Sequence, residues 1–563
     1  MTPSRAELRL RSAMAAATKT GDPQAWLTAA TALQDFLARR DPDGAGRTQL
    51  RHDLLDACEQ LRRRWSSRTG RLWVAQQADQ VTGPPLRDLL DDADPDPAEV
   101  FDLTEAARAR ALLDALSGCF HGDSGDPGES GQAGRVLAFA PEADPDPLLR
   151  EMRLISAVRT ADDEQAPARR EALAAVESMY EIAGTGFRGG AGPAGLAAVQ
   201  AALHPDEVLV EYVVPNHPLH PAMGLAALVI AADDVRLVPD LRLPDQYTSG
   251  FIGSYFIDGR APVDASPMGD MVVSTRRAVQ GDDPAAAFEA GRMLYDVLVG
   301  PVLDRAPARC IVVPHRQLHP VPWMALIDPT GTPWLASTTV TVCPSASVWT
   351  HLAGRRRTGW SALALGDPLL GYAGMSPLPQ AAAEVEHLGE VWHAAGLPAD
   401  VHTGALANVA ALRSAGGASV VHLATHATFP DSATGEDHQL LLSLSAGSSG
   451  RVPASLLRTL DFQHAWCLTF SVCNGGLYRI APGDEPLGLI PAALEAGATS
   501  VIAAQWPVDD LAGRQLMSHF VENLPGGDPA AALRTAALTM AGQGAPTRDW
   551  ATFVATGSGR GSV

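Results

Sequence analysis

Two short apolar segments each end in a side chain that can take part in covalent chemistry. Residues 420–427 (VVHLATHA) contain His426, and residues 468–476 (LTFSVCNGG) contain Cys473. A short apolar run bounded by turn residues predicts a strand buried on both faces, as in parallel sheets. Because the carboxyl ends of such strands line the ligand crevice of an α/β sheet, we expect the imidazole to lie beside the thiol. This pairing generates a thiolate nucleophile, so the sequence predicts a cysteine peptidase.

Each residue of this predicted site has a defined role. Cys473 is the expected nucleophile, and since a free thiol has a pKa of about 8.5 it needs a partner to ionise at neutral pH. His426 is that partner, and later the acid that protonates the leaving amine. The backbone N–H groups of Ala427, Cys473 and Gly475 are expected to form the oxyanion hole. The competing interpretation is an inert buried cysteine, which suits Cys467, in the middle of the predicted strand.

The order of the predicted elements indicates an α/β protein. From residue 360 onward strands and helices alternate, which predicts a mostly parallel sheet with helices on both faces. Before it, residues 208–214 and 225–237 read as an antiparallel pair, and residues 240–285 read as an irregular excursion. The predicted strands of the alternating part are 362–365, 399–402, 420–424, 440–444, 465–470 and 500–505. Its predicted helices are 380–395, 408–414, 454–460, 488–496, 511–523 and 529–540.

The amino-terminal part of the chain has the sequence pattern of helices. Residues 1–120 carry apolar side chains at helical spacing with charged faces between them, and a second helical pair follows near residues 146–182. No clean 34-residue period is present, so degenerate tetratricopeptide-like pairs are one interpretation of these helices. We therefore divide the chain into a helical region at 1–195 and two further parts at 196–355 and 356–563.

Composition excludes several classes of function. The chain has 563 residues and a net charge of −21, which argues against direct binding of nucleic acid. It contains 1 lysine, Lys19, among 43 basic residues and no GxxxxGK[ST] phosphate loop, so nucleotide-driven or pyridoxal chemistry is not expected. No apolar run is long enough to span a membrane, and residues 1–14 lack the pattern of a secretion signal. With 6 cysteines that fit no disulfide framework, a cytoplasmic location is expected.

The histidines do not indicate a metal site. His422 lies four residues before His426, and on a strand these positions point to the same side. No third ligand follows in a zinc spacing, so no metal and no cofactor are expected. We interpret His422 as a core residue or as a residue supporting His426, and His315, His319 and His464 as structural.

Read together in order, these segments resemble the CHAT domain, a caspase-like clan CD peptidase family often fused to tetratricopeptide repeats. The resemblance rests on VVHLATHA, SVCNGG and QWPVDD, supported by IVVPHRQLHPVPWMAL, PSASV, LALGDP and WATFVATG. It implies a caspase-like fold in which residues 196–355 are a degenerate, inactive counterpart of the active half at 356–563. Upstream, EAARARALLDALS (105–117) resembles the helix that closes the repeat region in such fusions. Family members usually carry Gly where this chain has Ala427.

The resemblance also implies where the substrate residue before the cut would bind. The corresponding positions are Asp367, and Gln505, Trp506 and Asp509 in QWPVDD. Asp367 would pair with a basic substrate residue, and Trp506 would form an apolar wall. The alternative is structural: Asp367 caps a turn, and Asp509 caps the helix that begins near Leu511.

Two functions remain open at this point. The first is an endopeptidase that cleaves a protein substrate after a protein activator or sensor engages its helical region, since helical-repeat surfaces are binding surfaces. The resemblance associates such fusions with bacterial antiviral defence or stress signalling. The second is a catalytically inactive CHAT-fold scaffold that binds proteins, which would need neither His426 nor Cys473.

Overall fold

The chain divides into two compact units. The computed structural model describes residues 4–20, 94–119 and 192–560, with scattered positions between 28 and 90. Gaps in the last range fall at 215–224, 245–254, 258–260, 264–266, 356–358, 371–376, 430–437, 446–447, 474, 477 and 482. One unit comprises residues Met1–Gln77 and Leu113–Gly192, and the other comprises Ala78–Leu112 and Pro193–Val563. The second unit therefore includes residues 78–112. The division made from the sequence had placed these residues in the helical region, 1–195.

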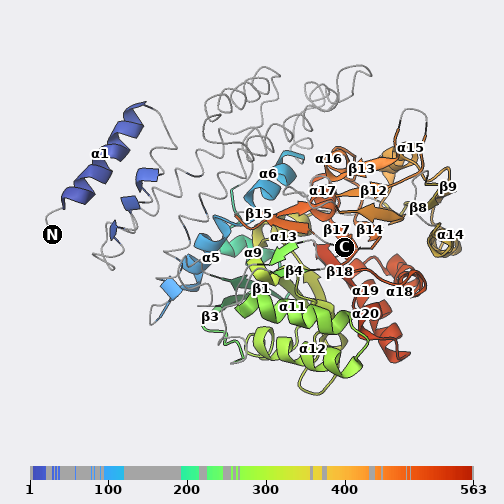
Figure 1. Cartoon of the computed structure of the whole chain (residues 1–563), viewed down its shortest axis with the longest axis horizontal. Coiled ribbons are helices and arrows are strands. Elements are labelled where there is room, and N and C mark those ends of the chain that lie inside the picture. Colours follow the sequence, from blue (N-terminus) through green and yellow to red (C-terminus); the bar gives the residue numbers. More distant parts are fainter. Residues whose placement is uncertain are drawn as a thin grey trace. The chain divides into compact units, whose positions relative to one another are not determined.

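The second unit is built around one 11-stranded sheet (Figure 1). In spatial order its strands are β3 (Val235–Val238), β2 (Ala226–Ile230), β1 (Glu207–Val213), β6 (Arg309–Val313), β7 (Thr339–Val342), β18 (Phe553–Gly557), β17 (Ser500–Ala504), β14 (Cys467–Ser471), β10 (Val420–Ala424), β8 (Ala362–Pro368) and β9 (Ala399–Gly404). Neighbours are parallel except for the pairs β1–β2, β2–β3 and β17–β18. The predicted fold class, a mostly parallel sheet flanked by helices, is confirmed.

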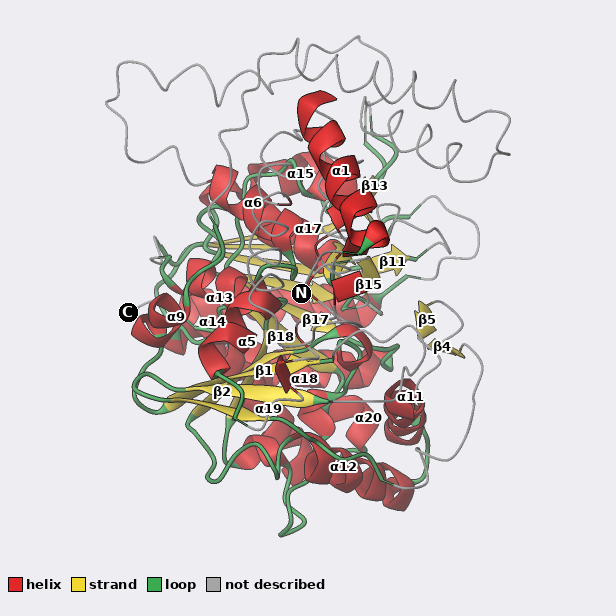
Figure 2. Cartoon of the chain, turned by 90° about the vertical axis from the view of Figure 1, so that its left-hand side faces the viewer, coloured by secondary structure: helices red, strands yellow, loops and turns green. Residues whose placement is uncertain are grey.

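Helices cover both faces of this sheet. In Figure 2, α13 (Ala346–Ala353) and α17 (Leu489–Glu495) lie on one face, and α11 (Pro267–Gln280) and α19 (Pro529–Gly542) on the other. The other α-helices in the described part of this unit are α5 (Pro97–Glu105), α9 (Leu196–Ala202), α12 (Pro284–Leu298), α14 (Pro379–Ala394), α15 (Val409–Arg413), α16 (Ala454–Leu457), α18 (Asp510–Asn523) and α20 (Thr547–Trp550). Burial on both faces explains why β10, β17 and β18 contain buried residues only.

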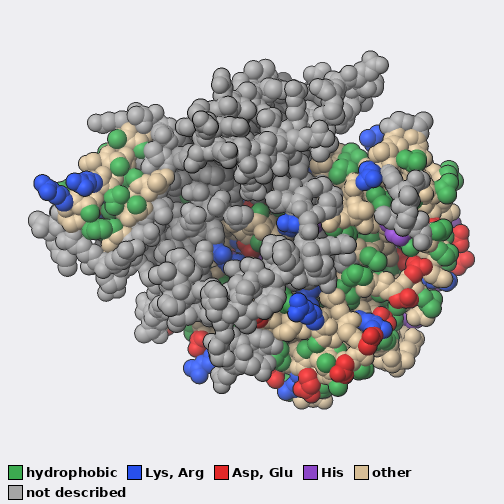
Figure 3. Space-filling view, in the orientation of Figure 1, with side chains coloured by type: hydrophobic (Ala, Val, Ile, Leu, Met, Phe, Trp, Pro, Cys, Tyr) green, Lys and Arg blue, Asp and Glu red, His purple; other side chains and the backbone are tan. Residues whose placement is uncertain are grey.

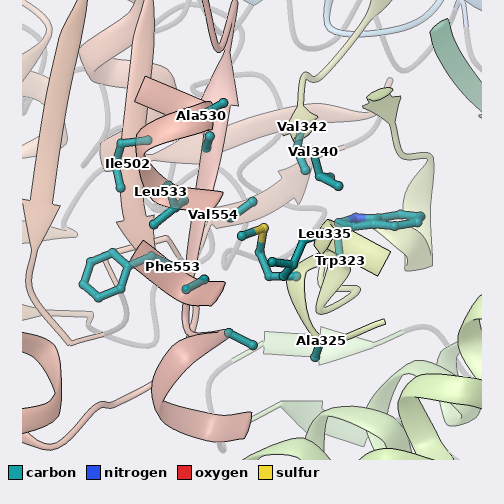
Figure 4. Packing of buried hydrophobic residues seen from close by; sticks show 14 of the residues in the cluster. Trp323, Ala325, Leu335, Val340, Val342, Ile502, Ala530, Leu533, Phe553 and Val554 are labelled. Carbon is teal, nitrogen blue, oxygen red and sulfur yellow. The ribbon is translucent and has the colours of Figure 1, made fainter. Parts of the chain in front are cut away.

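The core continues across the predicted boundary at residue 355. Figure 4 shows Trp323, Leu335 and Val340 packed near Leu533 and Val554, which lie far beyond residue 355 in the sequence. The strand β18 makes this junction, because it pairs with β17 in antiparallel fashion and with β7 in parallel through Thr556 and Val342. The two predicted halves of the domain thus share one sheet and one core.

Outside the large sheet, the described structure also contains three small strand groups and two further α-helices. The strand groups are β4 (Tyr255–Ile257) with β5 (Ala261–Val263), β11 (His426–Thr428) with β12 (Gln439–Leu441) and β13 (Arg451–Pro453), and β15 (Tyr478–Ala481) with β16 (Glu485–Gly488). The helices are α1 (Arg5–Thr20) and α6 (Arg110–Cys119). These two helices agree with the helices predicted in residues 1–120. The residues that would test the tetratricopeptide interpretation lie outside the described part of the chain.

The structure corrects three predicted elements. Residues 240–285 are not irregular throughout, because they contain α11. The predicted strand 225–237 is two strands, β2 and β3, joined by a turn in which Ala231 N–H donates to Asp234 O at 2.9 Å. The strand predicted at 440–444 is β12, outside the large sheet. None of the helices in the described part of the chain is both long and apolar enough to cross a membrane.

Candidate active site

The strands that carry the two proposed catalytic residues are direct neighbours. β10 and β14 run parallel, and Ala424 lies opposite Ser471 in their register. His426 follows Ala424 by two residues, and Cys473 follows Ser471 by two residues. Since adjacent strands are about 4.8 Å apart, the two segments leave the same edge of the sheet side by side. The structure therefore brings together the ends of the two strands, as the sequence predicted.

Cys473 differs from the other described cysteines in its exposure. Its side chain is exposed, whereas Cys467 is buried in β14. Burial raises the pKa of the Cys467 thiol to about 12, which makes it unreactive at neutral pH. The Cys473 thiol donates a long hydrogen bond to Val508 O, at 3.9 Å, in the loop between β17 and α18. Exposure and position thus single out Cys473 as the accessible thiol at this edge.

The turn after Cys473 is held tightly against the strand ends. Gly475 N–H donates to Val472 O at 3.1 Å, and Gly476 N–H donates to Ala504 O at 2.7 Å. A Cβ atom at position 475 would lie 2.6 Å from Val472 Cγ2, so this position requires glycine. The Gly475 N–H, one of the three expected oxyanion donors, donates to Val472 O in this conformation. The remaining predicted donors are the N–H groups of Ala427 and Cys473.

His426 begins β11, which pairs with β12 so that His426 lies opposite Leu441. Its side chain is half-buried, and Ala427 follows it in the same strand. This short antiparallel pairing fixes the backbone of the imidazole-bearing residue immediately beyond the end of β10. The position of His426 is thus set by two sheets at once.

His422 serves the core of the domain. Its Nε2 atom lies 2.6 Å from Glu384 Oε1, and both side chains are buried between β10 and α14. This pair satisfies polar groups that would otherwise be buried without a partner. The structure describes no group of His, Cys, Asp or Glu side chains suited to a metal ion in residues 94–119 or in the described parts of 192–560.

The predicted pocket residues have defined structural contacts. Asp367 has the left-handed φ of 42°, and its Oδ1 accepts the Leu378 N–H at 2.6 Å. Asp509 caps α18 by accepting the N–H groups of two residues in its first turn. Gln505 and Trp506 are buried, and the indole N–H of Trp506 donates to Arg548 O at 2.8 Å. In this conformation the Trp506 ring belongs to the core and offers no open wall to a substrate.

Carboxylates nevertheless gather at the ends of β8 and β17. Burial raises the pKa of Asp510, and the negative charges of Glu384, Asp509 and Asp367 raise it further. Acidic side chains are also visible over the surface formed by α14 and α18 (Figure 3), which includes the exposed Glu390 and Glu522. Asp367, Asp509 and Asp510 therefore lie close enough to influence one another near the end of β8.

A buried network that the sequence did not predict joins the segment after Cys473 to residues 105–112. Arg108 donates to Glu211 Oε1 and to Tyr212 O, both at 2.8 Å, and its Nε lies 3.7 Å from Asp484 Oδ2. Asp484 in turn accepts from Arg316 N–H at 2.9 Å. Each of these charged side chains except Arg316 is buried. The only sequence signal near this network was the resemblance of residues 105–117 to the helix that closes the repeat region in CHAT fusions.

The network shifts the ionisation of its members. Burial alone would raise the pKa of Asp484, but His319, His315 and Arg108 hold it well below its usual value. Burial, together with the carboxylate of Glu105, raises the pKa of Glu211 well above its usual value, although Arg108 opposes this effect.

Two histidines of the network lie in the loop after β6. Burial, assisted by the charge of Arg108, lowers the pKa of His315, whose Nδ1 accepts the Val214 N–H at 2.9 Å. His319 Nε2 lies 3.0 Å from Asp484 Oδ2. The two residues interpreted as structural histidines therefore support the carboxylate that follows the nucleophile turn.

Comparison with known proteins identifies one family. Residues 289–558 match the family model of the CHAT domain, which confirms the resemblance over that range. No curated protein shows a significant match to this chain.

Solved structures provide only a distant likeness. The Arg-specific cysteine proteinase gingipain R has a TM-score of 0.33 and 12% identity over 53% of this chain and 75% of its own. A Saccharomyces cerevisiae separase–securin complex has a TM-score of 0.37 and 12% identity over 98% of this chain and 44% of its own, so this chain spans less than half of that protein. Identity and TM-score are both low, so these structures say nothing about the activity of this chain.

Proposed function

We propose that this chain, whose residues 289–558 match the CHAT domain, is a cysteine endopeptidase that cleaves a protein substrate. The observation that carries the proposal is the register of β10 and β14, in which Ala424 lies opposite Ser471. An imidazole and an exposed thiol follow these positions at equal spacing. A binding module would need neither side chain.

The proposed reaction follows from the chemistry of these groups. His426 takes the proton of Cys473, and the thiolate sulfur attacks the carbonyl carbon of the scissile peptide bond. The N–H groups of Ala427 and Cys473 stabilise the oxyanion, and one such donor typically lowers the barrier by about 3–4 kcal/mol. When the C–N bond breaks, His426 transfers its proton to the leaving amine. A water molecule, deprotonated by His426, then hydrolyses the thioester and restores the thiol.

We further propose that the peptidase is activated through its N-terminal helical region, by a protein activator or sensor, in the cytoplasm. Bacterial antiviral defence or stress signalling is the setting that the CHAT resemblance favours. The net charge of −21 over the whole chain argues against direct contact with nucleic acid, which leaves a protein as the proposed partner.

The experiment that tests the activity compares two cysteine variants. The purified chain is incubated with candidate partner proteins, and cleavage is followed by gel electrophoresis and mass spectrometry. We expect Cys473→Ala and His426→Ala to abolish cleavage. Cys467→Ala, which removes a buried thiol with a pKa of about 12, is expected to retain it. Equal activity of both cysteine variants would contradict the assignment.

The alternative function is an inactive scaffold for protein binding. Two observations favour it: the thiol contacts Val508 O, and Ala427 stands where the family usually has Gly. Alkylation by iodoacetamide distinguishes the two functions, because an activated Cys473 reacts faster at pH 6.5 than an ordinary thiol. A rate equal to that of free cysteine at this pH would favour the scaffold.

For the substrate residue before the cut, we propose a basic side chain bound near Asp367. One oxygen of Asp367 is occupied by the Leu378 N–H, and the charge of the carboxylate is reinforced by Asp509 and Asp510. The left-handed backbone at Asp367 supports a functional role, because such strain is concentrated at active and binding sites. Trp506 contributes to this pocket only by holding the loop in place.

A further inference from the structure

The turn that carries the proposed nucleophile continues directly into a hairpin. β15 starts five residues after Cys473, and β16 returns so that Glu485 lies opposite Ala481. Gly488 then leads into α17 with a φ of 144°. Contacts that fix this hairpin therefore also restrain the backbone that follows Cys473.

The hairpin is fixed by the beginning of α6. The Glu485 carboxylate accepts the Ala111 N–H through Oε1 and the Leu112 N–H through Oε2, the latter at 3.3 Å. Glu485 is fully buried, and a carboxylate at a helix N-terminus complements the partial positive charge of the free N–H groups. Both oxygens are thus used, each by a different residue of the helix.

The neighbouring residues of the hairpin reinforce this attachment. Ala109 N–H donates to Gly483 O at 3.2 Å, and Arg108 Nε lies 3.7 Å from Asp484 Oδ2. Ala109 and Asp484 both have left-handed backbones, with φ of 47° and 53°. Non-glycine residues hold such conformations only where the surrounding contacts impose them. The two segments therefore determine each other's conformation.

The attached segment is itself fastened to the first part of the sheet. Glu105 accepts N–H groups of Ala346 at 3.1 Å and Ser347 at 2.8 Å, at the beginning of α13. Arg108 holds Glu211 at the end of β1. Residues 105–112 are therefore a structural part of the sheet-containing unit, although they lie far outside the matched range of 289–558.

We propose that Glu485 is a positioning residue that couples α6 to Cys473, so that a displacement of α6 changes the geometry of the nucleophile. The division of the chain into two units falls inside α6, after Leu112, so the helix bound by Glu485 continues into the helical region. This inference rests on the proposed function of Cys473. It names the residues through which a change in the helical region would alter the position of the Cys473 thiol.

The test uses the full chain and two substitutions of the same residue. Glu485→Gln keeps the size of the side chain but leaves one acceptor for two N–H groups, so one hydrogen bond is lost. Glu485→Asp keeps the charge and is too short to reach both N–H groups, and it serves if the Gln variant does not fold. Glu495→Gln is the matched control, because Glu495 is also buried and pairs with Arg458 at 2.6 Å.

Two readouts separate positioning from general stability. Hydrogen exchange followed by mass spectrometry should rise at least tenfold in peptides covering 105–112 and 478–488 together, with less than a twofold change in Glu495→Gln. The rate of alkylation at Cys473 should fall at least threefold at pH 6.5, where only an activated thiol reacts rapidly, and stay unchanged at pH 9.

The outcomes are distinguishable. An activated wild-type thiol whose pH profile is unchanged in both Glu485 variants would overturn the coupling and leave the proposed function intact. Increased exchange in 478–488 without increased exchange in 105–112 would also overturn it. A wild-type Cys473 that reacts no faster than free cysteine at pH 6.5 would overturn the proposed function and the coupling with it.

Discussion

Replacing Arg108 with Ala is expected to destabilise the sheet-containing unit severely. The guanidinium is buried with 1% of its side chain exposed, and it contacts Glu211, Asp484 and the Tyr212 carbonyl. Removing one partner of a buried ion pair costs about 3–5 kcal/mol, because the remaining charge is left without compensation. Since whole domains are stable by only about 5–15 kcal/mol, the loss is large.

The effect of Arg108→Ala should depend on pH in a defined direction. Burial and Glu105 already raise the pKa of Glu211, and losing the opposing charge of Arg108 raises it further. A carboxyl whose folded pKa is raised stabilises the fold at low pH, and this stability is lost as pH rises through the folded pKa. The variant should therefore be less impaired at pH 5.5 than at pH 8.

Urea denaturation followed by tryptophan fluorescence measures this change, because Trp323 stacks on Tyr212 at 5.5 Å. The control is Arg242→Ala, whose pair with Asp240 is exposed and contributes only about 0.5 kcal/mol. A loss below about 1 kcal/mol for Arg108→Ala, or a loss that grows toward pH 5.5, would refute the electrostatic reasoning.

Three further predictions concern the site and its support. Gly475→Ala places a Cβ 2.6 Å from the Val472 side chain and should lower the rate of substrate cleavage at least tenfold, whereas Gly417→Ala, with open space around it, should not. Asp367→Asn should lower kcat/KM at least tenfold for peptides with Arg before the cut and not for peptides with Leu there; an equal loss for both would contradict the pocket. Because burial lowers the pKa of His315, its contribution to stability is present above about pH 6.5 and is lost as pH falls below that value. The difference in unfolding free energy between pH 7.5 and 5.5 should therefore shrink in His315→Asn, and an unchanged difference would refute this.

The sequence predicted the strands of the candidate site because their signal is local. β10 was predicted at its observed limits, and β14 within two residues, since continuous apolar runs mark strands buried on both faces. The helix α11 was missed because the Gly, Pro and Asp residues around it suggest loops. The local sequence does not show that one face of this helix packs against the rest of the domain.

The contacts of Glu485 and Arg108 that hold the candidate site could not be predicted from the sequence, for a different reason. Glu485 and Ala111 are separated by 374 positions, and nothing in either segment specifies the other. Neither Glu485 nor Arg108 belongs to a motif whose spacing predicts a contact with the other segment. Glu485 and Arg108 are both buried, and a buried charged side chain requires a partner that only the folded chain supplies.

The location of β18 has a consequence for biosynthesis. Its residues, Phe553–Gly557, occupy the middle of the sheet between β7 and β17, yet they follow the other ten strands of this sheet in the sequence. While the polypeptide is still being translated, the edges of β7 and β17 have no strand between them. The nascent polypeptide therefore cannot complete this sheet until β18 has been synthesised.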